Sequence, residues 1–230
     1  GVASVLVATP FILIQWNLKR LLAYSSIEHV GIMAVGFGLG GETAVFGALL
    51  HMTYHTFAKP VAFFSAGTLA QLHRASDFDG IGGGTLGRTP VASGLLLLAT
   101  LMLTGSPPFG LFFSEMTILK AGFSGPHVAI GSLFLAALVV LFCGFFYQVG
   151  RLVLGEGPGL VLGEGPGLVL AGDPGPVRGG DPGSVLPERL DLALGTTLVA
   201  AVLAIVSAFY LPGPLVALIR AAVRVVEAGA

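Results

Sequence analysis

Charged side chains are scarce in this chain of 230 residues. Asp, Glu, Lys and Arg together make up 10% of it, and the formal net charge is −1. This balance gives no electrostatic basis for binding nucleic acid, so we expect no nucleic-acid partner. Cysteine is almost absent as well. Cys143 is the only one, so the chain can form neither an internal disulfide nor a metal site built from cysteines.

Apolar residues dominate instead. They make up 54% of the chain, and the mean hydropathy is +0.92. That composition is typical of a membrane protein that crosses the bilayer several times, and we expect an all-α fold. Marking off stretches of about 20 apolar residues predicts a partial helix that ends at Trp16, followed by spans over residues 21–39, 43–72, 91–116, 128–149 and 190–211.

The first sixteen residues are apolar but lack the positive n-region and the small-residue cleavage site of a signal peptide. They resemble the end of a helix that has already begun. We therefore expect the chain to be the C-terminal part of a longer subunit.

The span over residues 91–116 is interrupted by Thr104-Gly-Ser-Pro-Pro-Phe109, which contains Gly105, Pro107 and Pro108. Each half has only about 14 residues, too few to cross the bilayer alone. If the two halves form one crossing, the basic residues of the loops all fall on the same side, as the positive-inside rule requires. We therefore predict one discontinuous helix with an unwound centre, of the kind that lines a cavity in a membrane. The basic residues concerned are Lys19, Arg20, Arg74, Arg88, Arg151, Arg178 and Arg189.

His51, His55 and Lys59 stand four residues apart, so they share one face of the third span. An ionisable group at that depth costs roughly 2.5–3.5 kcal/mol on insertion scales. Glu28, beside His29 in the second span, and Glu115, just after the helix break, are further candidates for the same function. Acids, imidazoles and an ammonium group brought together in a bundle interior are the components of a proton relay.

These polar residues are also compatible with simpler roles. A single buried histidine often only hydrogen-bonds a neighbouring carbonyl, and Glu28 is close enough to Lys19 and Arg20 to belong to the membrane interface. Histidines at i and i+4 can also bind zinc. However, Met52 stands where metalloproteases have Glu, and no third ligand lies nearby in the sequence. We expect no metal and no other cofactor. Lys120, near a helix end, is expected to extend its ammonium group to the interface.

The chain divides into three regions. Residues 1–150 form the membrane domain, residues 151–189 a linker, and residues 190–230 a last transmembrane helix with a short amphipathic helix. The linker contains a tandem repeat of eight residues, rich in Gly and Pro, which favour neither a helix nor a packed sheet. In the final segment Arg220, Arg224 and Glu227 share one face, which is typical of a helix on the membrane surface.

Three motifs occur in order along the chain. They are Asn17-Leu-Lys-Arg-Leu-Leu-Ala-Tyr-Ser-Ser-Ile-Glu-His29, His51-x3-His55-x3-Lys59 and Gly105-Ser-Pro-Pro-Phe-Gly-Leu-Phe-Phe-Ser-Glu115. Together they resemble the antiporter-like proton-translocating subunits of respiratory complex I, multisubunit cation/proton antiporters and energy-converting hydrogenases. The form of the first and third motifs is most similar to the F-type subunits of hydrogenase 4. Where the family usually has Asp, this chain has Asn17, and either side chain can cap a helix.

The resemblance implies a proton-translocating subunit of a redox-driven complex in the cytoplasmic (inner) membrane. It places the hydrated proton axis at His51, His55 and Lys59 and the ionisable residue of the broken helix at Glu115. The expected partners are other membrane subunits and peripheral redox subunits, with protons or sodium ions as the transported species. The chain carries no redox site of its own, so we expect a non-catalytic subunit. A sodium/proton antiporter subunit and a structural membrane anchor remain as alternatives.

Overall fold

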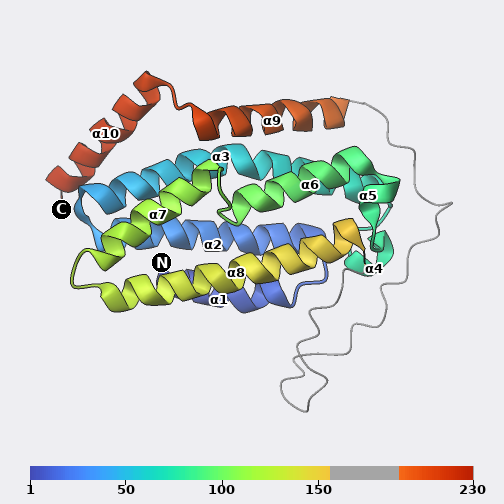
Figure 1. Cartoon of the computed structure of the whole chain (residues 1–230), viewed down its shortest axis with the longest axis horizontal. Coiled ribbons are helices and arrows are strands. Elements are labelled where there is room, and N and C mark those ends of the chain that lie inside the picture. Colours follow the sequence, from blue (N-terminus) through green and yellow to red (C-terminus); the bar gives the residue numbers. More distant parts are fainter. Residues whose placement is uncertain (156–191, 230) are drawn as a thin grey trace, which may run out of the picture.

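The computed structural model describes residues 1–155 and 192–229, and within them every regular element is a helix (Figure 1). The helices are α1 (Val2–Leu13), α2 (Leu18–Leu39), α3 (Gly41–Leu72), α4 (Phe78–Ile81), α5 (Thr85–Arg88), α6 (Pro90–Leu103), α7 (Gly110–Phe123), α8 (Val128–Leu154), α9 (Leu192–Phe209) and α10 (Gly213–Ala228). This confirms the all-α fold.

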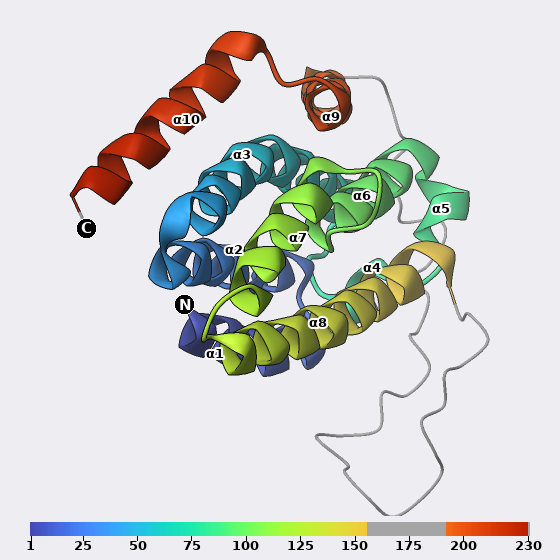
Figure 2. The ribbon, with the colours of Figure 1, turned by 60° about the vertical axis from the view of Figure 1, so that its left-hand side comes forward.

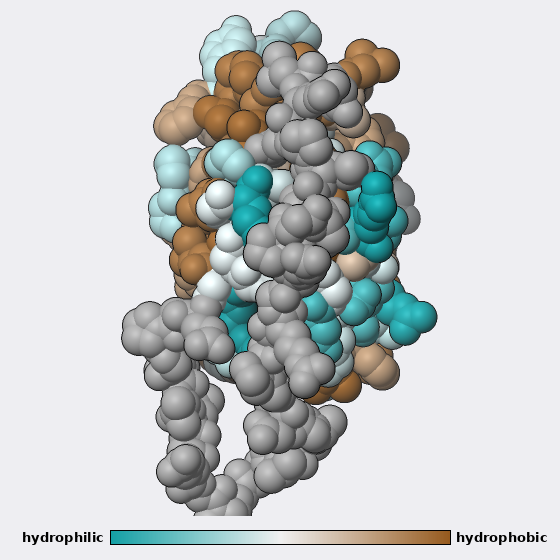
Figure 3. Space-filling view, turned by 90° about the vertical axis from the view of Figure 1, so that its right-hand side faces the viewer, coloured by the Kyte–Doolittle hydropathy of each residue, from teal (hydrophilic) through white to brown (hydrophobic). Residues whose placement is uncertain are grey.

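Three connecting segments meet at one end of the helix bundle. Asn17 caps α2 by accepting hydrogen bonds from the backbone of Lys19 and Arg20. Its side chain also donates to Ser76 Oγ, beyond the end of α3, at 3.0 Å. Gln148, near the end of α8, donates to the carbonyl of Leu13 at 2.7 Å. The ends of α1, α3 and α8 therefore lie together, and hydrophilic side chains are exposed at this end (Figure 3).

The discontinuous helix is present where the sequence predicted it. Helix α6 ends at Leu103 and α7 begins at Gly110, with six non-helical residues, 104–109, between them. Each half has 14 residues, about 21 Å of helix, whereas the hydrocarbon core is about 30 Å thick. The two halves follow one another through the bundle, and α8 returns in the opposite direction (Figure 1). They therefore form one crossing.

Three helices among the described residues, α2, α8 and α9, are long and apolar enough to cross a bilayer. Helix α3 is longer still, with 32 residues, and carries His51, His55 and Lys59, which are called the polar row below. Large apolar side chains on α8 and α9 are exposed, among them Val139, Val202 and Leu203, as expected of surfaces that face lipid. Helix α8 continues to Leu154, four residues into the segment assigned to the linker. The first residues of the repeat, from Leu152, are thus helical, and the linker from residue 156 onward lies outside the described residues.

Helix α7 packs closely against α3 because a glycine faces it. A Cβ atom on Gly47 would lie 2.8 Å from Ile118 Cγ1 and 3.2 Å from the backbone nitrogen of Ile118. Only a residue without a side chain lets the two helices approach to this distance. The close approach brings the first turns of α7, with Ser114 and Glu115, toward the polar row of α3.

Helix α10 runs at an angle to α9 (Figure 2) and packs against α3. Ile219 and Val223 are buried, whereas Arg220, Arg224 and Glu227 are exposed. The amphipathic helix predicted for the final segment is therefore formed, and its position on a membrane surface stays a prediction.

Candidate functional site

The polar row of α3 faces α2, which runs antiparallel to it (Figure 1). Lys59 Nζ donates hydrogen bonds to Ser25 Oγ at 2.6 Å and to the carbonyl oxygen of Leu22 at 3.0 Å. One turn earlier on α3, the His55 ring stands beside that of His29, with 4.8 Å between the ring centroids. The spacing of four residues thus places the row on one face, as predicted, and α2 supplies its partners.

A continuous chain of hydrogen bonds joins α2, α3 and α7. His29 Nδ1 lies 3.0 Å from His51 Nε2, and His51 Nδ1 lies 2.9 Å from Ser114 Oγ. Ser114 Oγ in turn donates to the carbonyl of Leu111 at 2.8 Å. All three side chains are fully buried, with 0% exposure. Buried hydrogen bonds that connect three helices hold these side chains in fixed orientations.

The carbonyl group of Leu111, at the end of this series of hydrogen bonds, determines which nitrogen atoms carry the protons. A carbonyl oxygen can only accept, so Ser114 uses its proton on Leu111 and must accept from His51 Nδ1. Neutral His51 then has a lone pair on Nε2, and His29 donates its Nδ1 proton to it. This leaves His29 Nε2 as the open end of the chain, and it has no hydrogen-bond partner among the described residues. His55 Nε2 is also buried without a hydrogen-bond partner among the residues that the structure describes.

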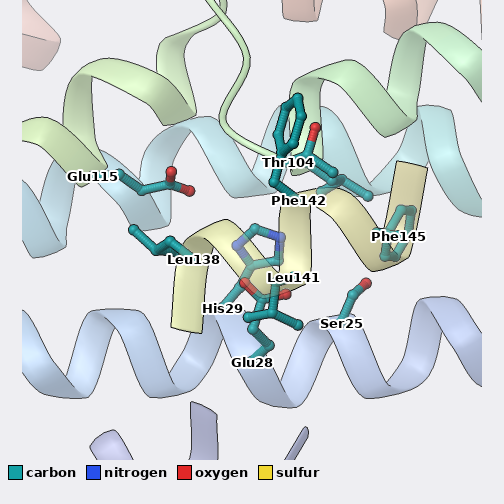
Figure 4. Close-up of a pocket in the computed structure, with 10 residues that line it drawn as sticks. Ser25, Glu28, His29, Thr104, Glu115, Leu138, Leu141, Phe142 and Phe145 are labelled. Carbon is teal, nitrogen blue, oxygen red and sulfur yellow. The ribbon is translucent and has the colours of Figure 1, made fainter. Parts of the chain in front are cut away.

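The two candidate carboxyl groups face a small cavity between α2, the helix break and α8. Glu28 and His29 line it from α2, Thr104 from the break and Glu115 from α7 (Figure 4). Its volume is about 10 Å³, which is the space that about one water molecule requires. Its lining is polar on one side, so a water molecule there would have hydrogen-bond partners. The side of α8 contributes apolar residues: Leu138, Leu141, Phe142 and Phe145.

Glu115 reaches the helix break itself. Gly105 has a backbone φ of 62°, and the Glu115 carboxyl group occupies the position that a Cβ atom of residue 105 would take. The break therefore does more than end α6. Its Gly105 leaves space for a buried acidic side chain, and Glu115 is only 5% exposed.

All five side chains proposed from the sequence lie in one region: Glu28, His51, His55, Lys59 and Glu115. Glu28 interacts electrostatically with both Lys59 and Glu115 across it. Lys120 is exposed in the last turn of α7, as expected for a lysine at a helix end.

Two side chains of the site were not predicted from the sequence, namely Ser25 and Ser114, whereas His29 was noted beside Glu28 among the polar residues of the second span. A signal for Ser25 existed, because Ser25, Glu28 and His29 follow a spacing that places them on one face of a helix. Nothing in the sequence indicated that Ser114 contacts His51.

The fold also assembles a set of potential metal ligands. The sequence offered only two histidines in one helix and no third ligand nearby. In the fold, His29 and Glu115 come to His51, and one donor atom from each of the three lies within 4.8 Å of the others.

Comparison with known proteins identifies the family. The family model described as "NADH:quinone oxidoreductase/Mrp antiporter, TM" matches residues 1–142. The chain belongs to this family. Members of this antiporter family are integral membrane subunits, so the chain is part of a multi-pass membrane protein, and the resemblance stated from its three motifs is confirmed.

Two curated relatives are similar over the same region. The "Hydrogenase-4 component F homolog" of Methylacidiphilum infernorum is 38% identical over 154 residues, which cover 67% of this chain and 30% of that protein. The D-type subunit of a Na(+)/H(+) antiporter from Alkalihalophilus pseudofirmus is 30% identical over 129 residues, covering 56% of this chain and 26% of that protein. The chain thus spans about a third or less of the length of these relatives.

A solved structure shares the fold over nearly the whole chain. It is the membrane-bound sulfane sulfur reductase, described as an archaeal respiratory membrane complex. The TM-score is 0.76 and the identity 24%, and the match covers 98% of this chain and 41% of that one. Similar structures are subunits of membrane complexes with several subunits.

Proposed function

We propose that this chain is the proton-relaying part of a membrane subunit in a redox-driven complex of the hydrogenase or NADH:quinone oxidoreductase type. The observation that carries the proposal is the hydrogen-bonded chain from His29 through His51 to Ser114, in the interior of a membrane domain. Membership of the antiporter family supports it, because its members named above include both hydrogenase and antiporter subunits.

The geometry supports transfer of a proton through bonds without movement of a side chain over a long distance. A proton taken up at His29 Nε2 would let His29 pass its Nδ1 proton to His51 Nε2 across 3.0 Å, which makes His51 the imidazolium and His29 the neutral imidazole. Ser114 ends the hydrogen-bonded chain on a carbonyl oxygen, so His51 holds this proton until it returns to His29 by the reverse step. Such a short contact between two rings suits proton transfer. On one side of His29, Lys59 and Glu28 can exchange a proton through Ser25 or water. On the other side, Glu115 can exchange one through water in the cavity.

The partners and the orientation follow from the same proposal. Lys19, Arg20, Arg88 and Arg151 lie at or near the end of the bundle where α1, α3 and α8 end, and the positive-inside rule assigns that end to the cytoplasm. The protein would then reside in the cytoplasmic membrane, beside other membrane subunits. Peripheral redox subunits would carry out the electron transfer.

Two alternatives have to be separated from this proposal. The similarity to a subunit of a Na(+)/H(+) antiporter favours exchange of sodium for protons. A purely structural membrane anchor is the other possibility, since polar contacts between helices also hold membrane bundles together. Each predicts a different ion flux in vesicles: proton uptake driven by redox turnover, proton movement driven by a sodium gradient, or neither.

Two substitutions in the full-length protein test the relay. We expect Lys59→Met and Glu115→Gln each to reduce redox-driven proton uptake at least about tenfold while the complex still assembles, because each removes an ionisable group and keeps a similar volume. Matched controls are Lys120→Met and Glu42→Gln, which make the same changes at exposed positions. Proton uptake and subunit content are measured on the same vesicles.

The outcomes distinguish the three functions. Normal proton uptake in both Lys59→Met and Glu115→Gln would contradict the relay, and a parent protein that moves neither protons nor sodium would support the anchor. Proton movement that follows an imposed sodium gradient without redox turnover would support the antiporter.

A further inference from the structure

His29, His51 and Glu115 place three potential metal ligands around one point. They come from α2, α3 and α7, and one donor atom of each lies within 4.8 Å of the other two. All three residues are buried, with exposures of 0%, 0% and 5%. The three helices that carry them pack directly on one another. The arrangement is therefore held by the core of the bundle and not by a surface loop.

The chemistry of these ligands selects one kind of cation. Two imidazole nitrogens and one carboxylate oxygen suit zinc, and the combination of two histidines and one glutamate occurs in zinc sites that keep a fourth position open. Calcium and magnesium prefer sites made of oxygen alone. A zinc-type divalent cation is thus the ligand that this set fits.

The distance between the two histidines is close to the value that zinc requires. Zinc–nitrogen bonds of about 2.0–2.1 Å in tetrahedral geometry place two ligand nitrogens about 3.3 Å apart. His29 Nδ1 and His51 Nε2 are 3.0 Å apart. A shift of a few tenths of an ångström between the rings would therefore admit the metal. His29 would take its other tautomer, with the proton on Nε2, and bind the metal through the lone pair of Nδ1 as a neutral imidazole.

Groups around the three ligands supply the rest of a metal site. Ser114 accepts a hydrogen bond from His51 Nδ1, which directs the lone pair of Nε2 toward His29. Such outer contacts orient metal-binding histidines. The cavity that His29 and Glu115 both line has room for about one water molecule, which could fill the fourth position.

The charges that face the three ligands allow a cation to bind. Glu28 faces them from α2, and His55 and Lys59 face them from α3. With Glu28 and Glu115 ionised, Lys59 protonated and the histidines neutral, the formal charge of the cluster is −1. The ammonium group of Lys59 repels a bound metal cation. Its hydrogen bonds to the Leu22 carbonyl and Ser25 hold it in place on the α2 side.

We propose that His29, His51 and Glu115 form a binding site for Zn²⁺ or a similar divalent transition metal. The metal would take the place of the hydrogen bond between His29 and His51. If the proposed relay is correct, metal binding stops proton transfer at that contact. Binding itself does not depend on the function of the chain.

The binding test uses Zn²⁺ and the purified complex that contains the full-length protein. The complex carries an affinity tag without histidine and Cys143→Ser, which removes the exposed thiol of this chain. Competition with a chromogenic zinc chelator measures affinity. We expect His51→Gln and Glu115→Gln each to lower the zinc affinity of one site by at least about tenfold. Substitution of residues that only hydrogen-bond to metal ligands already lowers metal affinity by about that factor. His55→Gln, one helical turn from His51, and the exposed Glu42→Gln should leave it within about twofold of the parent.

Several outcomes would overturn the proposal. One is unchanged binding in both His51→Gln and Glu115→Gln, and another is an equal loss in His55→Gln. A measurement on the unmutated site is independent of how the variants fold. X-ray absorption at the zinc edge should show only nitrogen and oxygen neighbours at about 2.0–2.1 Å, with the outer-shell pattern of two imidazoles, and a site with fewer imidazoles would contradict the assignment.

Proton uptake by the same preparation separates the two proposals. Binding with the expected ligands together with loss of proton uptake supports both. Binding that leaves proton uptake unchanged keeps the metal site but contradicts a relay through His29 and His51. If zinc does not bind to these residues, the metal proposal fails and the tests of Lys59 and Glu115 still decide the relay.

Discussion

Ser114 fixes which nitrogen of His51 carries the proton, although it is not ionisable itself. Its hydroxyl group donates to Leu111 and accepts from His51 Nδ1. Replacing Ser114 by alanine would leave the Nδ1 proton of His51 without a partner in a buried site, at a cost of about 1–3 kcal/mol. His51 could then adopt the other tautomer and donate to His29 Nδ1, which reverses this hydrogen bond and places the His29 proton on Nε2, so that His29 Nε2 no longer takes up a proton.

We therefore predict that Ser114→Ala lowers the rate of proton uptake by the assembled complex severalfold or more. Ser65→Ala is the matched control. Ser65 is equally buried on α3, but its hydroxyl group bonds only to carbonyls of its own helix. Proton uptake rates of the two variants, normalised to subunit content, make the comparison. Equal rates in the two variants would contradict a role of Ser114 in orienting His51.

Among the individual residues of the site, the shared face of His51, His55 and Lys59 could be predicted from the sequence. His51, His55 and Lys59 share a face because they are four apart in one helix, and that rule needs no tertiary information. The sequence also placed Glu28 and His29 together in the second span. Both prove to be buried, but only the packing of α2 against α3 reveals that His29 bonds to His51. Contacts between helices depend on their relative rotation, which one sequence does not specify.

At the scale of an element, the break between α6 and α7 creates the space that Glu115 occupies. Gly105 has a positive φ, which costs other residues about 1–2 kcal/mol, and a Cβ atom there would meet the Glu115 carboxyl group. We predict that Gly105→Ala displaces Glu115 and lowers proton uptake by the assembled complex. Gly94→Ala is the control, since Gly94 lies within α6 with open space where its Cβ atom would be.

Thermal stability separates the two glycines as well. Alanine in a helix interior is favoured over glycine by about 0.5–1 kcal/mol, so Gly94→Ala should leave the unfolding temperature of the complex unchanged or raised. Gly105→Ala should lower it. The break could be predicted from Gly105, Pro107 and Pro108 because these residues oppose a helix locally. The contact of Gly105, inside the break, with Glu115, in α7, depends on how the two segments are oriented in space, so local rules could not supply it.

At the scale of the whole molecule, the number of crossings determines which loops share a side of the membrane. If α6 and α7 make one crossing, Gly87 and Gly125 lie on opposite sides. Two separate crossings would place them on the same side. Both glycines are exposed, with open space around the position of a Cβ atom, so cysteine is tolerated at either.

We predict that Gly125→Cys reacts with an impermeant maleimide added outside spheroplasts, whereas Gly87→Cys reacts only after permeabilisation. Both are made in full-length protein with Cys143→Ser. Labelling of both from the outside would contradict the single broken crossing. The loop charges allowed this prediction from sequence, because the positive-inside rule acts on each loop separately and needs no packing information.

The orientation of α3 also gives the site a response to voltage. Lys59 and His51 are eight residues apart on one face of the helix, roughly 12 Å along its axis, which is roughly two fifths of the hydrocarbon thickness. A unit charge that crosses a whole membrane gains about 2.3 kcal/mol per 100 mV. A proton that moves along this row would therefore gain or lose about 0.9 kcal/mol per 100 mV by the same relation. The membrane potential itself would thus help to set which end of the row holds the charge.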